Sequence, residues 1–342
     1  MPAPADRPLL LAVDAPSLLH RGHHAHVGSG RLDRGGRPAW ALHGMLRLIL
    51  QVLEDLTPDA VVFGLDDRRA SVRAERYPAY KAGRKPKEPE LVEQLDRAPG
   101  FLAALGLHAV QPEGLEADDV SASAASLAEA SGWRCTIATS DRDAFAHISE
   151  HTSVLRLITG GIASAPLLTP ARLHTMYGVP AAQYLEYAAL RGDASDNLPG
   201  VAGIGEKSAA LLLAVAGDMA AAWTDVELNA GDALRPALDD ACEAEGRSRV
   251  GRRVVTALTS EGARERYDFN VEIMRGRDDL DLGLDLSRLQ HPGPGVLPLD
   301  PDRVRRVVDH LDDPTLTDHA LRVLARQPTG DGAAGAVAPA HR

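Results

Sequence analysis

Cysteine is scarce in this sequence, and long apolar runs are missing. The 342 residues include only Cys135 and Cys242, which are too few for a disulfide framework and lack the spacing of a metal site. The apolar run over residues 9–13 is too short for a signal peptide or a membrane span. We therefore expect no contact with a membrane and a location in the reducing cytoplasm.

Positive charge is also in deficit. The formal net charge is −11, which argues against a nucleic-acid partner because phosphate binding usually requires a basic surface. This objection weakens if many acids form one metal-binding cluster while the basic residues gather elsewhere. A hydrophobic fraction of 44% is sufficient for a sizeable core. We predict a single domain over residues 9–325 and a disordered tail over residues 327–342.

Short apolar runs alternate with helical stretches, which is the pattern of an α/β fold with a central, mostly parallel sheet flanked by helices. Three of these runs, over residues 9–13, 60–65 and 135–140, are followed by Asp14, Asp66 and Asp141. The carboxyl ends of parallel strands meet at one edge of a sheet, so the three carboxylates are expected to converge there. A single aspartate in such a place is more often a turn or helix-capping residue, but three together favour a site.

Further acidic residues stand in three short segments that suit the same edge. Residues 114–119 open a predicted helix, residues 140–143 follow a strand, and residues 191–197 carry two acids at i and i+3. Acids in a first helical turn also suit the helix dipole, so a purely structural explanation exists for some of them. Together with the strand-end aspartates, the candidates are Asp14, Asp66, Glu116, Asp118, Asp119, Asp141, Asp143, Asp193 and Asp196.

If these carboxylates converge, their mutual repulsion raises their pKa values and destabilises the fold unless cations lie among them. Oxygen ligands without histidine or cysteine select hard ions, so we predict Mg²⁺ or Mn²⁺ rather than Zn²⁺. Two such ions about 4 Å apart suit in-line displacement at a phosphodiester, because one activates water and both neutralise charge on the phosphate. The predicted chemistry is phosphodiester hydrolysis with two metal ions.

Four segments together resemble one family, the 5′-nucleases that include flap endonucleases and the 5′-nuclease domain of bacterial DNA polymerase I. They are residues 80–84 (YKAGR), 116–119 (EADD), 139–143 (TSDRD) and 192–209 (GDASDNLPGVAGIGEKSA). The resemblance extends over nearly the whole ordered chain. It implies that the nine acids bind the metal ions. It also implies a substrate, DNA with a 5′ flap, a nick or a free 5′ end, and a flap endonuclease and 5′→3′ exonuclease activity in replication and repair.

A basic segment directly follows Asp66. Between residues 68 and 87 the Lys and Arg residues are opposed only by Glu75. Tyr77 and Tyr80 are interleaved with them, and an aromatic ring can stack on an unpaired base. A basic stretch is as often a solvated face, but its place after a strand-end acid favours a DNA contact.

The resemblance identifies residues 68–98 as the arch of the family, a helical insertion in the α/β fold. It implies that Lys81 and Arg84 contact the scissile phosphate as electrostatic stabilisers. It also implies that Arg73 and Arg21 line the same region, together with the two tyrosines.

The glycine-rich segment over residues 200–208 allows more than one explanation. A P-loop needs a lysine directly after its second glycine, whereas here Glu206 intervenes and no apolar strand precedes the segment, so we exclude an ATPase. A loop that only caps a helix is a simpler alternative. We interpret the segment as part of a helix-hairpin-helix-like subdomain over residues 181–223, in which glycines permit a tight turn and a helix N-terminus offers N–H groups to a phosphate.

The resemblance implies that this subdomain grips duplex DNA and that K⁺ binds at the 200–208 hairpin. The DNA contacts implied there are Gly203, Gly205, Lys207 and Ser208.

Four histidines lie close together near the start of the sequence. We interpret His20, His23, His24 and His26 as surface or DNA-path residues rather than metal ligands.

Two other functions are alternatives to a nuclease of this family. The first is a structure-specific DNA-binding protein without catalysis, although such a protein gains nothing from keeping like charges together. The second is a ribonuclease of the small-toxin type, although those chains are far shorter and lack the glycine-rich segment.

Overall fold

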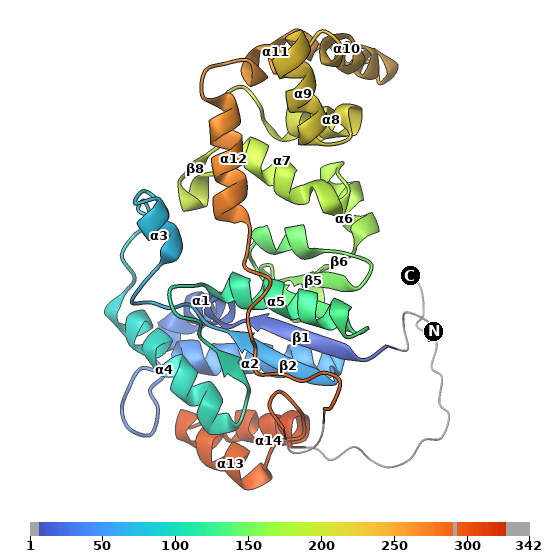
Figure 1. Ribbon diagram of the computed structural model, residues 1–342. Coiled ribbons are helices and arrows are strands. Elements are labelled where there is room, and N and C mark those ends of the chain that lie inside the picture. Colours follow the sequence, from blue (N-terminus) through green and yellow to red (C-terminus); the bar gives the residue numbers. More distant parts are fainter. Residues whose placement is uncertain (1–6, 290–292, 326–342) are drawn as a thin grey trace.

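The structure, a computed structural model, describes residues 7–289 and 293–325. The tail predicted over residues 327–342 lies outside these residues. The molecule is elongated, with a sheet and its covering helices at one end and a purely helical part at the other (Figure 1).

A six-stranded sheet forms the first part, in the order β3-β2-β1-β4-β5-β6. The strands from β3 to β5 pair in parallel, and β6 is antiparallel to β5. Their bounds are Leu9–Asp14 (β1), Ala60–Gly64 (β2), Ala109–Val110 (β3), Arg134–Thr139 (β4), Thr152–Arg156 (β5) and Leu167–Leu168 (β6). The predicted α/β fold with a mostly parallel sheet is therefore confirmed.

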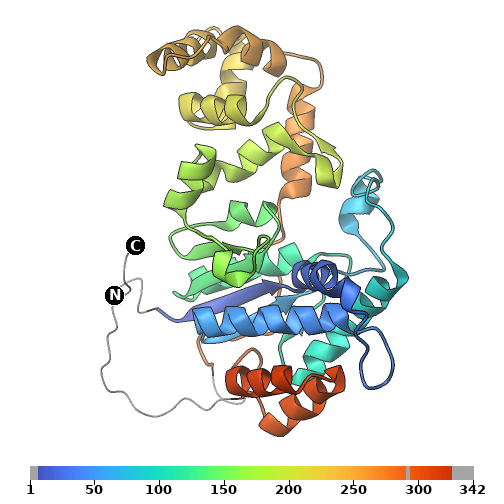
Figure 2. The same cartoon turned by 180° about the vertical axis from the view of Figure 1, so that it is seen from behind.

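Helices cover both faces of the sheet, which explains why every residue of β1 and β2 is buried. Because side chains alternate along a strand, Leu10 and Ala12 pack on the face covered by α5, whereas Leu11 and Val13 pack on the opposite face. Figure 2 shows the blue helices α1 and α2 lying across that opposite face. The helices around the sheet are α1 (Ala15–His26), α2 (Trp40–Leu56), α3 (Val72–Arg76), α4 (Pro89–Leu105), α5 (Ala117–Ala130), α13 (Pro301–Val308) and α14 (Pro314–Leu324).

The helical part is inserted between β6 and the last two helices. Its elements are α6 (Pro170–Tyr177), α7 (Tyr184–Arg191), the short hairpin β7 (Gly192–Asp193) and β8 (Leu198–Pro199), α8 (Glu206–Ala216), α9 (Met219–Asn229), α10 (Leu234–Ala244), α11 (Gly251–Leu258) and α12 (Ala263–Met274). Helix α12 leads back toward the sheet (Figure 1). The following residues, 275–289 and 293–300, contain neither α-helix nor strand, as the proline-rich sequence there predicts.

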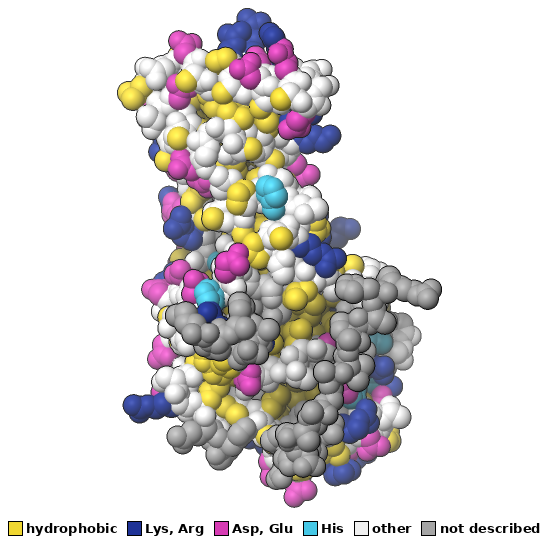
Figure 3. Space-filling model, turned by 90° about the vertical axis from the view of Figure 1, so that its right-hand side faces the viewer, with side chains coloured by type: hydrophobic (Ala, Val, Ile, Leu, Met, Phe, Trp, Pro, Cys, Tyr) yellow, Lys and Arg dark blue, Asp and Glu magenta, His cyan; other side chains and the backbone are white. Residues whose placement is uncertain are grey.

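The charged side chains are mixed on the face of Figure 3, where acidic and basic groups are interspersed over the described residues. The negative net charge is therefore not gathered on that side. Within the described residues no single helix is long and apolar enough to cross a membrane; α8 and α9 pass that test only together, and the chain bends by 83° between them.

Helices α1 and α2 approach each other closely at two glycines, Gly22 and Gly44. A Cβ atom on Gly22 would lie 2.6 Å from the carbonyl oxygen of Ala41, which is backbone and cannot move cheaply. We expect Gly22→Ala to lower the free energy of unfolding by about 2 kcal/mol, the cost of overpacking a core. Urea unfolding at constant m-value measures this loss.

The matched control is Gly28→Ala. Its Cβ would meet no atom within 4 Å, so the urea midpoint should stay unchanged. Equal losses in Gly22→Ala and Gly28→Ala would show that the helix crossing is not tight.

Candidate metal-binding active site

Aspartates stand at or just beyond the carboxyl ends of the neighbouring strands β2, β1 and β4. The carboxylate of Asp14 is buried and accepts hydrogen bonds from the N–H of Ser17 (2.9 Å) and the hydroxyl of Thr139 (2.6 Å). Asp66 accepts a hydrogen bond from the N–H of Ala117 (3.0 Å), at the start of α5. Both carboxylates are thus fixed at the sheet edge by neighbouring elements.

The chain after β4 carries Asp141 and Asp143 around one turn. The carboxylate of Asp141 accepts a hydrogen bond from the N–H of Asp143 at 3.0 Å. Asp143 then begins the short 3₁₀-helix over Asp143–His147. The charges of these two aspartates act on each other, and that of Asp141 also acts on Asp14.

Helix α5 begins at the acidic segment that was predicted to open it. Glu116 is the N-cap residue, and its N–H donates to the carboxylate of Asp119 at 2.9 Å in a capping box. The positive end of the helix dipole favours negative charge at Glu116 and Asp118.

The hairpin β7–β8 supplies Asp193 and Asp196. A Cβ on Gly192 would lie 2.2 Å from the backbone nitrogen of Gly200, so only glycine fits where the two strand ends meet. Asp196 is buried, and Asp193 accepts hydrogen bonds from the N–H and hydroxyl of Ser195 at 2.7 Å. The tight turn therefore carries Asp196 from the helical part to the wall of a cavity, whereas Asp193 lines neither cavity, although its charge acts on Asp143.

Two adjacent cavities hold most of these carboxylates. The larger cavity, of about 350 Å³, is lined by Asp14, Asp66, Glu116, Asp118 and Asp141 and has Lys81, Arg84 and Lys87 in its wall. The smaller cavity, of about 10 Å³, has room for about one water and adds Asp143 and Asp196. Glu116 and Asp118 line both cavities, so seven of the nine predicted acids form one continuous cluster.

Burial and mutual repulsion make the charged forms of these acids costly. Burial, together with the charge of Asp66, raises the pKa of Asp14 to about 7. Burial, together with the charge of Asp141, raises the pKa of Asp143 to about 8. The pKa of Asp118 is also raised well above its ordinary value, mainly by burial. The cluster therefore favours any process that brings positive charge among its oxygens.

The donors in this cluster fit hard divalent cations. They are carboxylate oxygens, the ligands that Mg²⁺ and Mn²⁺ prefer. Within residues 7–289 and 293–325, no three His, Cys, Asp or Glu side chains already lie together as a complete metal site. Ion binding therefore requires some of these side chains to turn toward a common centre.

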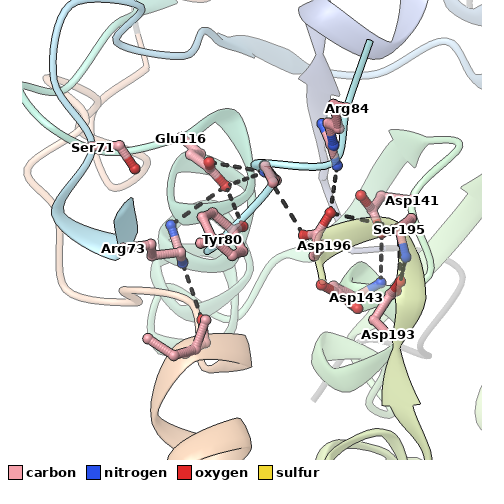
Figure 4. A network of polar contacts seen from close by, with 12 residues as sticks. Ser71, Arg73, Tyr80, Arg84, Glu116, Asp141, Asp143, Asp193, Ser195 and Asp196 are labelled. Atoms are coloured by element: carbon pink, nitrogen blue, oxygen red, sulfur yellow. Dashed lines mark hydrogen bonds and ion pairs between the residues drawn. The ribbon is translucent and has the colours of Figure 1, made fainter. Parts of the chain in front are cut away.

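Arg84 lies beside Asp196 among the acids (Figure 4), and Lys81 is paired with Glu116. The ammonium of Lys81 donates to both oxygens of Glu116 at 2.8 Å and lies 3.8 Å from Asp196, while Arg84 donates to Asp196. Burial alone would lower the pKa of Lys81, but Glu116 and Asp196 raise it above its ordinary value. The backbone of Lys81 has a φ of 57°, which is uncommon for a residue other than glycine. The surrounding fold therefore holds Lys81 in a backbone conformation that is uncommon for its residue type.

Asp119 has different surroundings from the seven acids that line the cavities, and its role as a metal ligand stays a prediction. It is fully buried and lines neither cavity. Its oxygens accept hydrogen bonds from both terminal nitrogens of Arg73 at 2.8 Å and from the N–H groups of Glu116 and Arg277 at 2.9 and 2.8 Å. Arg73 also donates to the carbonyl of Ile273 at 3.0 Å. The pair of Asp119 and Arg73 therefore fastens α3 to α5 and α12. Arg73 also lines the smaller cavity, and its role toward DNA stays a prediction.

Three other predicted DNA contacts have partners inside the protein. Tyr77 packs edge-on against Phe269 with ring centroids 5.0 Å apart. Tyr80 is buried, and its hydroxyl donates to Glu116 at 3.1 Å. Arg21 donates to two backbone carbonyls just after β5. In this structure these side chains brace the site, and their roles toward DNA stay predictions.

The segment over residues 200–208 forms a tight turn that leads into α8, as its glycines predict. Gly203 has a φ of 86°, and Gly205 is the N-cap of α8. Lys207 is exposed in the first helical turn, whereas Ser208 is buried and accepts a hydrogen bond from Arg253 at 3.0 Å. The turn therefore presents Gly205 and Lys207, but not the side chain of Ser208, to a partner.

Hydroxyl and amide side chains hold the acidic residues in place, and the sequence analysis missed them. Thr139 donates to Asp14, and the hydroxyls of Ser17 and Ser140 lie 2.5 Å apart across the ends of two strands. Asn197 adopts a left-handed backbone conformation and donates to the carbonyl of Ala79 in the arch segment, residues 68–98. A signal was present, because each of these residues stands within three positions of a predicted ligand.

Protonation of the cluster is expected to stabilise the metal-free protein. The pKa values of Asp14 and Asp143 in the folded protein, about 7 and about 8, exceed the ordinary value of 3.8. The folded protein therefore binds protons that the unfolded chain does not, and this stabilisation is lost as the pH rises through these values. From about pH 8 to about pH 6 we expect a gain of about 1–3 kcal/mol in urea unfolding with a chelator present.

Two comparisons test the origin of this gain. Mg²⁺ at high pH should restore part of the stability, and Asp143→Asn should reduce the pH dependence. A metal-free protein whose stability is constant or rises between the two pH values would contradict the electrostatic account.

Comparisons with known proteins identify the family of the chain. The family model described as 5′-3′ exonuclease, N-terminal resolvase-like domain, matches residues 9–178, and the one described as 5′-3′ exonuclease, C-terminal SAM fold, matches residues 179–290. The chain belongs to the 5′-3′ exonuclease family.

Curated relatives include DNA polymerase I of Mycobacterium tuberculosis, 33% identical over 319 residues that are 93% of this chain and 32% of the relative. The thermostable DNA polymerase I of Thermus thermophilus is 36% identical over 249 residues, which are 71% of this chain and 29% of the relative. The chain thus spans about a third of the length of these relatives.

Solved structures share the fold. A zinc-bound T5 5′-exonuclease has a TM-score of 0.56 at 18% identity, with 93% of this chain and 100% of that chain covered. The catalytic core of Rad2 in complex with DNA substrate has a TM-score of 0.55 at 17% identity, with 95% of each chain covered. At these identities the likeness concerns the fold alone.

Proposed function

We propose that this protein is a metal-dependent nuclease that hydrolyses DNA phosphodiesters at or near a 5′ end, as a 5′-flap endonuclease and 5′→3′ exonuclease. The supporting observation is that seven carboxylates share one cluster with Lys81 and Arg84 in its wall. The acids attract divalent cations, and the basic side chains attract a phosphate. A role in replication and repair in the cytoplasm would suit this activity.

The proposed cofactors are two or more Mg²⁺ or Mn²⁺ ions. Two bound ions would supply an activated water and would neutralise charge on the phosphate and the leaving oxygen. The candidate ligands are Asp14, Asp66, Glu116, Asp118, Asp141, Asp143, Asp193 and Asp196. Asp119 is left out of this set because four N–H groups already occupy its oxygens.

Lys81 and Arg84 would exchange partners during binding. Without DNA they donate to Glu116 and Asp196. A phosphate that enters the larger cavity would accept these charge-assisted hydrogen bonds and free both carboxylates to turn toward the ions. In the transition state the same two cations would stabilise the negative charge that develops on the phosphate.

The turn over residues 200–208 would hold the duplex part of the substrate. Gly205 and Lys207 stand at the N-terminus of α8, where N–H groups and the helix dipole suit a backbone phosphate. We propose K⁺ as an ion bound at this turn, between the protein and the phosphate.

Cleavage of an end-labelled 5′-flap DNA, with Mg²⁺, with Mn²⁺ and with a chelator, tests the function. We expect cutting near the flap junction with either ion and none with the chelator. Binding of the flap DNA without cutting under any condition would instead support a structure-specific DNA-binding protein. An RNA strand that is cut faster than the matching DNA would support a ribonuclease.

A further inference from the structure

Two histidines of α1, His20 and His24, line the larger cavity together with Lys87 of the arch segment. The two rings stack with centroids 6.5 Å apart. His20 is half-buried and His24 is exposed at the mouth. These three side chains face the same space as the acids, but nothing in the proposed cleavage step uses them.

The cations in this cavity differ in their partners. Lys81 and Arg84 are paired with Glu116 and Asp196. Among residues 7–289 and 293–325, Lys87 makes no ion pair, and its charge is opposed mainly by the more distant Asp66. Lys87 therefore leaves net positive charge at one side of the cavity, and this charge would stabilise a bound anion.

His20 is held neutral in this environment. Burial, together with Lys87, His24, His23 and Arg84, lowers its pKa to about 4. Asp14, Asp66 and Asp141, which line the same cavity, do not offset this lowering of the pKa of His20. An anion between His20 and Lys87 would offset the nearby positive charges, so the imidazole would take up a proton when the anion binds.

We propose that His20, His24 and Lys87 form a second phosphate-binding site, for the phosphates of the DNA strand on the 5′ side of the scissile bond. The proposal rests on the proposed function. The duplex-binding turn before α8 lies in the helical part, whereas α1 lies beside the sheet (Figure 1). The two histidines line only the larger cavity, while residues of β8 and α12, from the helical part, line the smaller one. A strand that leaves the duplex and passes Lys81 and Arg84 therefore reaches the histidines next, and in a 5′-nuclease this strand is the flap.

The test is equilibrium binding of fluorescent DNA with a chelator, so that nothing is cut. A duplex with a short 5′ flap is compared with the same duplex without the flap, at about pH 8 and about pH 6. If the pKa of His20 returns from about 4 to its ordinary value of 6.5 on binding, flap affinity should rise about fourfold on acidification beyond the rise for flapless DNA. His20→Gln should lose this fourfold gain, because a glutamine side chain cannot take up the proton.

Two further variants sharpen the result. Lys87→Met should weaken flap binding at both pH values and leave flapless DNA unaffected. His174→Gln, on the exposed surface of α6, is the matched control and should behave as the unchanged protein. The acid cluster titrates in the unchanged protein and in every variant, so its contribution to the pH dependence of binding cancels when the proteins are compared.

The proposal is overturned if His20→Gln keeps the full pH dependence, or if flapless DNA shows the same gain. It is also overturned if the gain occurs only with a nick that carries a terminal 5′-phosphate and not with a 5′-hydroxyl flap. Cleavage of the flap DNA with Mg²⁺, run in parallel on the unchanged protein, reports separately on the proposed function. If the unchanged protein cleaves the flap DNA while His20→Gln keeps the full pH dependence of flap binding, only the second phosphate site is wrong.

Discussion

Replacement of Asp118 by asparagine is expected to lower cleavage of 5′-flap DNA by at least about 10³-fold. Asp118 lines both cavities, and the charges of Asp141, Asp14 and Asp143 act on it. Bound divalent ions contribute several kcal/mol to stabilisation of the transition state, and each 1.36 kcal/mol corresponds to a factor of about ten in rate. Initial rates on end-labelled flap DNA with Mg²⁺ measure this loss.

The same substitution is expected to stabilise the metal-free protein. Burial raises the pKa of Asp118 well above its ordinary value, so the carboxylate costs free energy in the folded state. A neutral amide of the same shape removes this cost, and we expect a gain of at least about 1 kcal/mol, the equivalent of one pKa unit, near pH 8. Loss of activity combined with a gain of stability cannot result from misfolding.

Asp318→Asn, on the exposed surface of α14, is the control and should change neither quantity. Asp118→Asn with normal turnover would exclude the metal-ion mechanism at this site. Loss of both activity and stability would show that Asp118 is needed for the fold rather than for the ions.

The convergence of the strand-end acids was predictable because it depends only on local rules. Asp14, Asp66 and Asp141 each follow a short apolar run, and parallel strands place such positions at one edge. The structure adds that glycine is required at residue 192, because a Cβ there would lie 2.2 Å from the backbone nitrogen of Gly200. Fold class and most of the acid cluster therefore follow from short-range patterns.

The orientation of Asp119 was not predictable in this way. It is adjacent to Asp118, but in a helix successive residues point in different directions. Its partners come from Arg73, 46 positions away, and from Arg277, 158 positions away. Which of two neighbouring acids lines the cavities is thus decided by the long-range packing of α3 and α12 against α5, which no spacing in the sequence reveals.

The packing of the last two helices was also outside the reach of the sequence patterns. Val304 and Leu316, from α13 and α14, join the core on the face of the sheet that α1 and α2 cover. Asp313, before α14, accepts a hydrogen bond from His43 of α2 at 2.8 Å. His43 and Asp313 are 270 positions apart in the sequence, so no local pattern reveals the surface against which these helices pack.

Arg73→Met is expected to lower the free energy of unfolding by about 3–5 kcal/mol, the cost of breaking a buried ion pair by removing one partner. The carboxylate of Asp119 is 0% exposed, and the side chain of Arg73 is 13% exposed. Without the guanidinium, Asp119 would keep only two backbone N–H donors and would stay charged in a buried site. Urea unfolding of the metal-free protein measures the loss.

Arg76→Met is the matched control, one helical turn further along α3. Arg76 forms a bidentate ion pair with Glu272, but both side chains are more than half exposed, and such pairs contribute little. Its urea midpoint should therefore hardly move. Equal losses in the two variants would show that the pair of Arg73 and Asp119 is not special.

The double variant Arg73→Met with Asp119→Asn separates the structural role of Asp119 from a role as a metal ligand. Removal of the buried charge should restore much of the stability that Arg73→Met loses, because the two residues act as one unit. If Asp119 only positions the arch segment, the double variant should still be stabilised by Mg²⁺ as the unchanged protein is. A loss of that stabilisation would return Asp119 to the set of ligands, and the pair of Asp119 and Arg73 in the unchanged protein would then have to open when the ions bind.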